Sequence, residues 1–268
     1  MRLKVDATLN YVMADPVDVL LTVEAAQMHD QYLVQDRLVI DGVGPLRAIA
    51  GDEGIGRRTW MRAEGSFAAR YRAIVDVDRR PRTIDQLQIT PRRQLPAEVI
   101  PYLWPSRYCE SDRFEAFVER EFPGKVHGAR IHEMADWIHD HLDYVPGSTS
   151  GSTTASDVFV SRRGVCRDYA HLLTAFSRAA GVPARLVSAY AWQLDPPDFH
   201  AVVEVWLEGD WYLVDPSQLA PLDGLIRIAV GRDATDIAFM TIFGAAQLQD
   251  QSVRVTRLDH NGIEGFAA

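Results

Sequence analysis

The stretch that decides the fold reads RGVCRDYAHLLTAFSRAAGVPAR and spans residues 163–185. We predict a helix from Val165 to Ala180, because apolar residues recur there at helical spacing. Gly181 is a C-terminal cap signal, and Pro183 prevents the helix from continuing. Cys166 therefore lies at the helix start, where the helix dipole and the neighbouring arginines favour a thiolate. Taken alone, such a cysteine is more often a buried structural residue than a nucleophile.

The segment after this helix predicts a histidine and a carboxylate on adjacent strands. We expect strands at residues 185–193, 199–207 and 211–214. If Glu208 and Gly209 close a two-residue hairpin loop, His200 and Asp215 become diagonal neighbours on one face. The carboxylate would then fix the imidazole tautomer and stabilise the imidazolium. A three-residue loop would place Asp215 on the opposite face, so the sequence permits this pairing without requiring it.

Several motifs together resemble the bacterial transglutaminase-like superfamily. They lie at residues 163–172, 179–185, 199–204 and 211–217, within a match that runs from about residue 144 to 217. That family has a papain-like core with a helix-borne cysteine and a histidine and aspartate on adjacent strands. The resemblance implies that Cys166 is the nucleophile, His200 its base and Asp215 the orienting group. It implies a cysteine-dependent acyl-transfer enzyme acting on peptide or protein amides, without a cofactor or metal.

Two features of the motifs concern the substrate cleft. Val202 stands where many relatives have Trp, which changes the expected shape of the cleft. The backbone N–H of Cys166 at the helix start is a natural donor to an oxyanion. A second donor must come from elsewhere, and we consider Tyr144 for this role.

The rest of the chain predicts two domains of an α+β protein. Residues 1–105 read as an all-β sandwich, followed by a papain-like catalytic domain at residues 106–268, with a proline-punctuated connector between them. In the first domain we predict strands at Val17–Glu24, Tyr32–Ile40 and Phe67–Val77. In the second domain we also predict helices at Ser111–Phe122 and Gly128–Leu142 and a closing strand at Ser252–Leu258.

Composition excludes several classes of function. The net charge of −9 and pI of about 5.4 disfavour a nucleic-acid partner. No apolar run approaches the length of a membrane span, and the first residues lack a signal-peptide core, so we expect a cytoplasmic protein. The two cysteines, Cys109 and Cys166, cannot make a disulfide framework, and no CxxC motif indicates structural zinc.

The sequence also contains an alternative candidate for the base and a group of potential metal ligands. His171 is only five residues from Cys166, but that spacing is an offset of about 140° on a helix, so it faces away. A group of potential metal ligands fits the polar side of the second predicted helix better than a metal site; it consists of His132, Asp136, His139, Asp140 and Asp143.

Three functional alternatives remain open. Cys166, His200 and Asp215 could ligate a catalytic zinc ion, or the cleft could belong to a non-enzymatic binding module. Among acyl transfers, we favour hydrolysis of a peptide or isopeptide-like amide over transglutaminase-type amine transfer. The loop from Pro146 to Ala155 is small and polar, and we expect it to be ordered beside an open, wet cleft. The nearby aromatics, which could wall a dry amine tunnel, are more typical of core packing; they are Tyr190, Trp192, Phe199 and Trp206.

Overall fold

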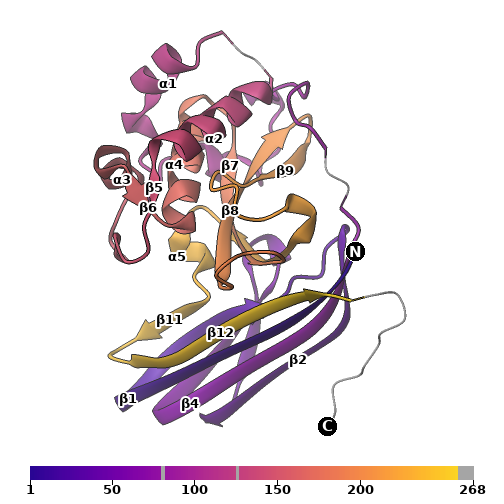
Figure 1. Ribbon diagram of the computed structural model, residues 1–268, viewed down its shortest axis with the longest axis vertical. Coiled ribbons are helices and arrows are strands. Elements are labelled where there is room, and N and C mark those ends of the chain that lie inside the picture. Colours follow the sequence, from indigo (N-terminus) through magenta and orange to yellow (C-terminus); the bar gives the residue numbers. More distant parts are fainter. Residues whose placement is uncertain (80–81, 125–126, 259–268) are drawn as a thin grey trace.

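The computed structural model describes residues 1–79, 82–124 and 127–258. It has an α+β fold in which two antiparallel sheets carry most of the strands and the helices gather around the second sheet (Figure 1). The predicted fold class is confirmed. Within the described residues, no helix is both long and apolar enough to cross a membrane.

The first sheet has the strand order β11-β1-β4-β2, with β12 also paired to β1 and β3 to β4. The long strands β1 and β4 pair along most of their length, with a bulge between Met13 and Val17. Alternate residues of β1 are buried, as the two-residue repeat of a half-buried strand requires. The strands of this sheet are β1 (Arg2–Glu24), β2 (Gln31–Val43), β3 (Arg47–Ala50), β4 (Arg57–Val77), β11 (Met240–Phe243) and β12 (Gln247–Arg257).

The strands expected to form a β-sandwich make up one continuous hydrogen-bonded sheet. Its buried face shares a hydrophobic core with Tyr190, Ile226 and Ile228, which belong to the second sheet. The apolar side of the first sheet therefore packs against residues of the second sheet.

The end of the chain returns to the first sheet. Strand β12 pairs with residues 3–12 of β1, and β11 pairs with residues 18–21. Two strands from the predicted second domain, residues 106–268, therefore belong to the sheet of the first hundred residues. An alternating pattern predicts a strand but does not specify its partner. The division near residue 105 itself stays a prediction.

The second sheet has the order β10-β7-β8-β9. Its strands are β7 (Ala184–Ala191), β8 (Phe199–Leu207), β9 (Asp210–Val214) and β10 (Leu225–Gly231). Glu208 and Gly209 both have positive φ, as in a two-residue type I′ hairpin loop. Leu207 lies opposite Asp210 and Glu204 opposite Leu213, so the predicted register of this hairpin is confirmed.

Helix α4 lies at the centre of the hydrophobic core formed by the helices and the second sheet. Its apolar side chains, Phe176 among them, pack with Ile131, Met134 and Ile138 of α2 and with the second sheet. The helices are α1 (Glu115–Glu121), α2 (Ala129–His141), α3 (Ala155–Ser161), α4 (Cys166–Ala179) and α5 (Ala234–Ile237). Short 3₁₀ turns lie at Asp52–Gly54, Arg92–Gln94, Ile100–Leu103, Ser111–Arg113 and Leu222–Gly224, and a two-residue parallel ladder joins β5 (Asp143–Tyr144) to β6 (Arg163–Gly164).

Candidate active site

Cys166 is the first residue of α4, as the sequence predicts, and it is half-buried. The turn before it is fixed by Asp168, whose carboxylate accepts a hydrogen bond of 2.9 Å from the backbone N–H of Val165. A side chain at Gly164 would lie 2.7 Å from the Cβ atom of Asp168, so only glycine fits there. The thiol is thus held at the positive end of the helix by its own first turn.

His200, near the start of β8, and Asp215, just after β9, form a buried ion pair. The Nε2 atom of His200 lies 2.8 Å from Oδ2 of Asp215, and both side chains are almost fully buried. The Oδ1 atom of Asp215 accepts hydrogen bonds from the backbone N–H and the hydroxyl of Ser217, at 2.9 and 2.6 Å. These contacts orient the carboxylate, and the carboxylate orients the imidazole.

The other nitrogen of His200 remains available to the thiol. Within the described residues, Nδ1 has no hydrogen-bond partner of standard geometry. Burial lowers the pKa of His200, but the hydrogen bond to Asp215 and the neighbouring Cys166 outweigh this effect and raise the pKa to about 10. Burial raises the pKa of Asp215, but its hydrogen bond and ion pair with His200 lower it overall. The surroundings of His200 therefore favour its charged imidazolium form, and those of Asp215 favour its carboxylate form.

Cys166 and His200 open on one mostly apolar cavity of about 360 Å³. We call it the apolar cavity. It is lined by Tyr108, Gly151, Cys166, Arg167, Ser188, Phe199, His200, Ala201, Ala234, Ile237, Ala238, Phe239 and Met240. The thiol and the imidazole thus face the same cavity, which is the geometry that nucleophilic catalysis would require.

Tyr144 lies beside Cys166. The ladder between β5 and β6 places Tyr144 opposite Gly164, two residues before the cysteine. Burial, the charge of Cys166 and contacts of the phenol with Cys166 keep the pKa of Tyr144 above its usual range, although a hydrogen bond with the cysteine backbone opposes this. The phenol of Tyr144 therefore lies close to the sulfur of Cys166. Its role as an oxyanion donor stays a prediction.

The small polar loop before α3 is ordered beside this site, as expected. The hydroxyl of Thr149 donates to the buried carboxylate of Asp168 at 2.6 Å. The guanidinium of Arg167 donates to the backbone oxygen of Ser150 at 3.0 Å and also pairs with Asp168. The loop therefore forms a rim fixed to the first turn of α4.

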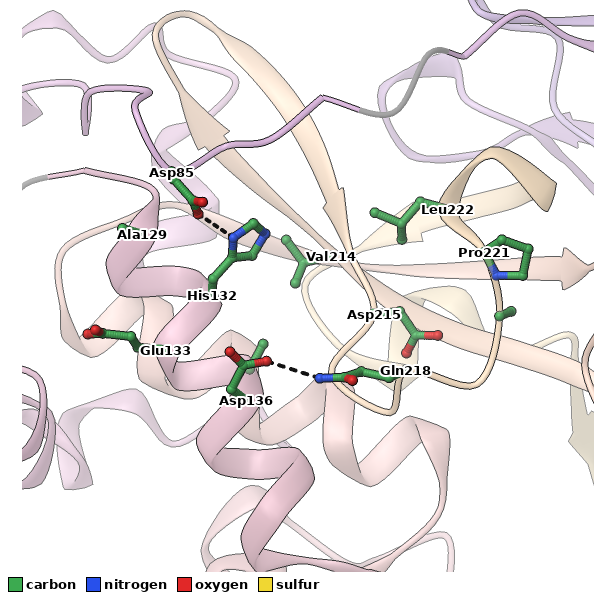
Figure 2. Close-up of a pocket in the computed structure, with 12 residues that line it drawn as sticks. Asp85, Ala129, His132, Glu133, Asp136, Val214, Asp215, Gln218, Pro221 and Leu222 are labelled. Carbon is green, nitrogen blue, oxygen red and sulfur yellow. Dashed lines mark hydrogen bonds and ion pairs between the residues drawn. The ribbon is translucent and has the colours of Figure 1, made fainter.

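A second, larger cavity adjoins the far side of Asp215. It has a volume of about 650 Å³, and Cys166 is not among its lining residues. Figure 2 shows its polar side chains, where His132 pairs with Asp85 and the amide of Gln218 donates to Asp136 at 3.0 Å. We call it the acidic cavity; it is lined by Asp85, Ala129, His132, Glu133, Ala135, Asp136, Val214, Asp215, Gln218, Ala220, Pro221 and Leu222. The polar face of α2 thus lines a cavity, whereas in the described part of the chain no three His, Cys, Asp or Glu residues are arranged to hold a metal ion.

Neither Val202 nor Arg162 is among the residues that line the apolar cavity. Val202 is fully buried in a cluster with other residues of the second sheet, and its effect on the shape of the cleft stays a prediction. The guanidinium of Arg162 lies 4.7 Å from the ring centre of Trp137 and 4.3 Å from that of Phe159.

Sequence reasoning missed the residues that close the apolar cavity. Tyr108 precedes α1, while Phe239 and Met240 follow α5 on the way to the first sheet. Of the four aromatics considered near the cleft, only Phe199 lines this cavity, where its ring stacks on Phe239 at 4.5 Å between centres. The one sequence signal for a wall of this cavity is the run of apolar residues at 237–240. That pattern is equally typical of a buried strand.

The fold and the site define an α+β protein with a cysteine at a helix start beside a buried histidine–aspartate pair. The model of the transglutaminase-like superfamily matches residues 118–216. The chain is also similar over 98% of its length to the crystal structure of a "Putative Cysteine Protease" from Cytophaga hutchinsonii, with a TM-score of 0.91, 33% identity and coverage of 92% of that chain. The protein belongs to the transglutaminase-like superfamily.

Curated relatives match only part of their length. An uncharacterized protein of Mycobacterium leprae is 36% identical over 140 residues, which are 46% of this chain and 48% of that protein. A protein-glutamine gamma-glutamyltransferase of Pseudomonas aeruginosa is 38% identical over 97 residues, which are 31% of this chain and 14% of that enzyme. The chain thus spans about half or less of these relatives.

Proposed function

We propose that this protein is a cysteine-dependent enzyme that hydrolyses peptide or isopeptide-like amides through a thioester on Cys166. The observation that carries the proposal is the arrangement around His200. Its Nε2 is bound to Asp215 at 2.8 Å, while the ring shares the apolar cavity with the thiol. A nucleophile, a base and an orienting carboxylate in this order are the parts that acyl transfer needs.

In the proposed reaction the Cys166 sulfur forms a bond to the amide carbonyl carbon, and the carbonyl oxygen becomes an oxyanion. The backbone N–H of Cys166 and the phenol of Tyr144 are the donors proposed to stabilise that oxyanion. His200 then gives its proton to the amine nitrogen, the C–N bond breaks, and a thioester remains. A water molecule transfers a proton to His200 and attacks the thioester, which releases the acid and restores the thiolate.

Access of water supports hydrolysis as the second half-reaction. The loop at residues 146–154 is mostly exposed or half-buried, and one of its members, Gly151, lines the cavity that holds the thiol. Amine transfer has to compete with water at about 55 M, which requires a site that excludes water and positions the amine. A polar rim of small residues does not provide such exclusion.

Amine transfer is the second candidate function. The partial similarity to the Pseudomonas protein-glutamine gamma-glutamyltransferase favours it, as does the apolar lining beside Cys166. Cys166, His200 and Asp215 serve both reactions equally, so these residues do not distinguish them.

A partition experiment separates the two. The protein is given a glutamine-containing peptide or a peptide amide together with excess butylamine, and both products are measured by mass spectrometry. We expect mainly the free acid, with Cys166→Ala as the inactive control. A product that is mainly the amine conjugate would contradict hydrolysis and identify a transamidase.

We also propose that the enzyme works in the cytoplasm on a peptide or protein substrate. Both cysteines are free within the described residues, and reducing compartments keep thiols in that state. Fractionation of the source cells tests this location, and recovery outside the cytoplasmic fraction would contradict it.

A further inference from the structure

The surface that the apolar cavity presents to a substrate is mostly hydrocarbon and carries little charge. Its floor and walls are mostly carbon: five of its lining residues are large apolar or aromatic side chains, namely Tyr108, Phe199, Ile237, Phe239 and Met240. Ala201, Ala234 and Ala238 contribute small apolar surfaces that leave the space open. A charged group placed here would lose its hydration without gaining an ionic partner.

The charged groups at the edge of the cavity are already paired. Arg167 binds the carboxylate of Asp168, which is itself fully buried, and also the backbone of Ser150. His200 is committed to Asp215. Among the described residues that line the cavity, no charged side chain is therefore left unpaired for an acidic or basic side chain of a substrate.

The wall of the cavity is fixed before any substrate arrives. The segment from α5 to β11 is held on the α4 side by His171, whose Nε2 accepts a hydrogen bond of 3.2 Å from the backbone N–H of Ala234. On the side of the first sheet, Arg58 donates to the backbone oxygen of Asp236 at 2.8 Å, and the N–H of Thr22 donates to the oxygen of Phe239 at 2.8 Å. A wall fixed from two sides does not spend binding energy on ordering itself.

The size of the cavity limits its occupant. Pockets for whole drug-sized ligands range from about 300 to 1,000 Å³, so about 360 Å³ is near the lower limit. That space fits one large side chain and the adjoining backbone. Since Cys166 and His200 open on the same space, the occupant must be attached close to the carbonyl that the sulfur attacks.

We infer that the apolar cavity is the specificity pocket for the acyl group and takes an uncharged apolar side chain of leucine, methionine or phenylalanine size. This inference rests on the proposed function and adds the class of substrate to it. The selectivity comes from the segment at residues 234–240, which runs from the catalytic half to the first sheet. The first sheet thus contributes to substrate choice through the wall that it holds.

The test uses peptide chloromethyl ketones that differ only in the side chain beside the ketone. The sulfur of Cys166 forms a C–S bond to the methylene carbon and chloride leaves, so labelling is read by intact mass without any amide hydrolysis. We compare second-order labelling rates for Ala, Leu, Phe, Asp and Lys side chains, with iodoacetamide as a probe that has no side chain. Leu and Phe are expected to exceed Ala by at least tenfold, since each methylene in an apolar pocket is worth about 10- to 200-fold. Asp and Lys are expected to fall below Ala.

A pair of matched variants connects the preference to this cavity. Ala238→Phe places a ring in the cavity and is expected to lower the Phe-to-Ala rate ratio at least tenfold. Ala245→Phe makes the same change at an exposed position between β11 and β12 and is expected to keep the wild-type ratio. If Ala238→Phe does not fold, the wild-type series alone decides the matter.

The outcomes separate this inference from the proposed function. Normal iodoacetamide labelling of Cys166 with equal rates for all five ketones, or a preference for Asp or Lys, would overturn the pocket and leave the proposed function standing. A Cys166 that resists iodoacetamide and every ketone would overturn the proposed function and this inference with it.

Discussion

His171 and His200 are both nearly fully buried, yet their surroundings favour different protonation states. His171 lies on α4, stacks on Tyr108 at 5.1 Å between ring centres and accepts a hydrogen bond from Ala234. Burial lowers its pKa to about 4, so it is neutral at pH 7. The pKa of His200 is raised to about 10 despite its burial, because Asp215 and Cys166 stabilise the cation.

The comparison shows that the partner, and not burial, decides what a buried histidine does. A neutral imidazole can accept a hydrogen bond from a backbone N–H, whereas an imidazolium has no lone pair to accept with. His171 can therefore fix the wall of the apolar cavity but has no carboxylate bonded to its ring. His200 has that carboxylate and is suited to exchange protons with the sulfur.

The largest effect is expected at the carboxylate that distinguishes the two histidines. Asp215→Asn should lower turnover by about 10⁴-fold while the protein stays folded, because the amide no longer holds the imidazole in its working tautomer. Asp210→Asn, at an exposed position of the same hairpin, is the matched control and should keep wild-type turnover. Near-normal activity of Asp215→Asn would remove this residue from the mechanism.

The two cysteines should differ nearly as strongly. Cys109 is fully buried, and burial raises the pKa of its thiol to about 12, so it is almost entirely protonated at neutral pH. Cys166 is half-buried at a helix start beside His200. Iodoacetamide at pH 7 should label Cys166 at least about a hundredfold faster, since the thiolate is the reactive form. Peptide mapping checks this, and equal or reversed labelling would contradict the assignment of the nucleophile.

Replacing His171 should affect the fold more than the chemistry. His171→Ala leaves the N–H of Ala234 without its acceptor and should lower the free energy of unfolding by about 1–3 kcal/mol. His139→Ala, on the exposed face of α2, should change it by less than about 0.5 kcal/mol. Chemical denaturation measures both values. A loss of turnover in folded His171→Ala as large as that of Asp215→Asn would make His171 the base and overturn the comparison.

Changes of pH should alter the stability contributions of the two histidines with opposite signs. The raised pKa of His200 means that its charged form stabilises the fold: this contribution is complete below the ordinary value of 6.5 and is lost as the pH rises through about 10. The lowered pKa of His171 means that the unfolded chain takes up its proton first: this contribution is complete above pH 6.5 and is lost as the pH falls towards 4.

Denaturation of the wild type, His200→Ala and His171→Ala across pH 4–10.5 measures these contributions. The wild-type advantage over His200→Ala should shrink above neutral pH, and the advantage over His171→Ala should shrink below it. A wild-type advantage over His200→Ala that grows with rising pH would show that the imidazole is not held as a cation.

The local part of the site could be predicted from the sequence because short-range rules determine it. Helix capping signals placed Cys166 at a helix start, and a two-residue loop set the register that joins His200 to Asp215. Helical spacing predicts that His171 faces away from Cys166, and its ring contacts Tyr108 and the backbone of Ala234. In each case the information lies within about a dozen residues of the motif.

The remainder depends on contacts between distant parts of the chain. Residues 237–240 wall the cavity because β11 pairs with β1, more than 200 residues earlier in the sequence. The partner of β12 could not be predicted either, because β12 also pairs with β1 at the other end of the sequence. Strand β10 has no alternating pattern, because it is buried on both faces. Arg162 could not be placed either, since its two aromatic partners come from α2 and α3.

The measurement that tests the central claim most directly is the trapping of an acyl group on Cys166. The protein is mixed with a peptide p-nitrophenyl ester, quenched in acid within the first turnovers, and its intact mass is determined. We expect a mass increase equal to the acyl group, mapped to Cys166, removed by hydroxylamine and absent from Cys166→Ala. Turnover that persists in Cys166→Ala, or an adduct that forms on Cys109 instead, would contradict the account.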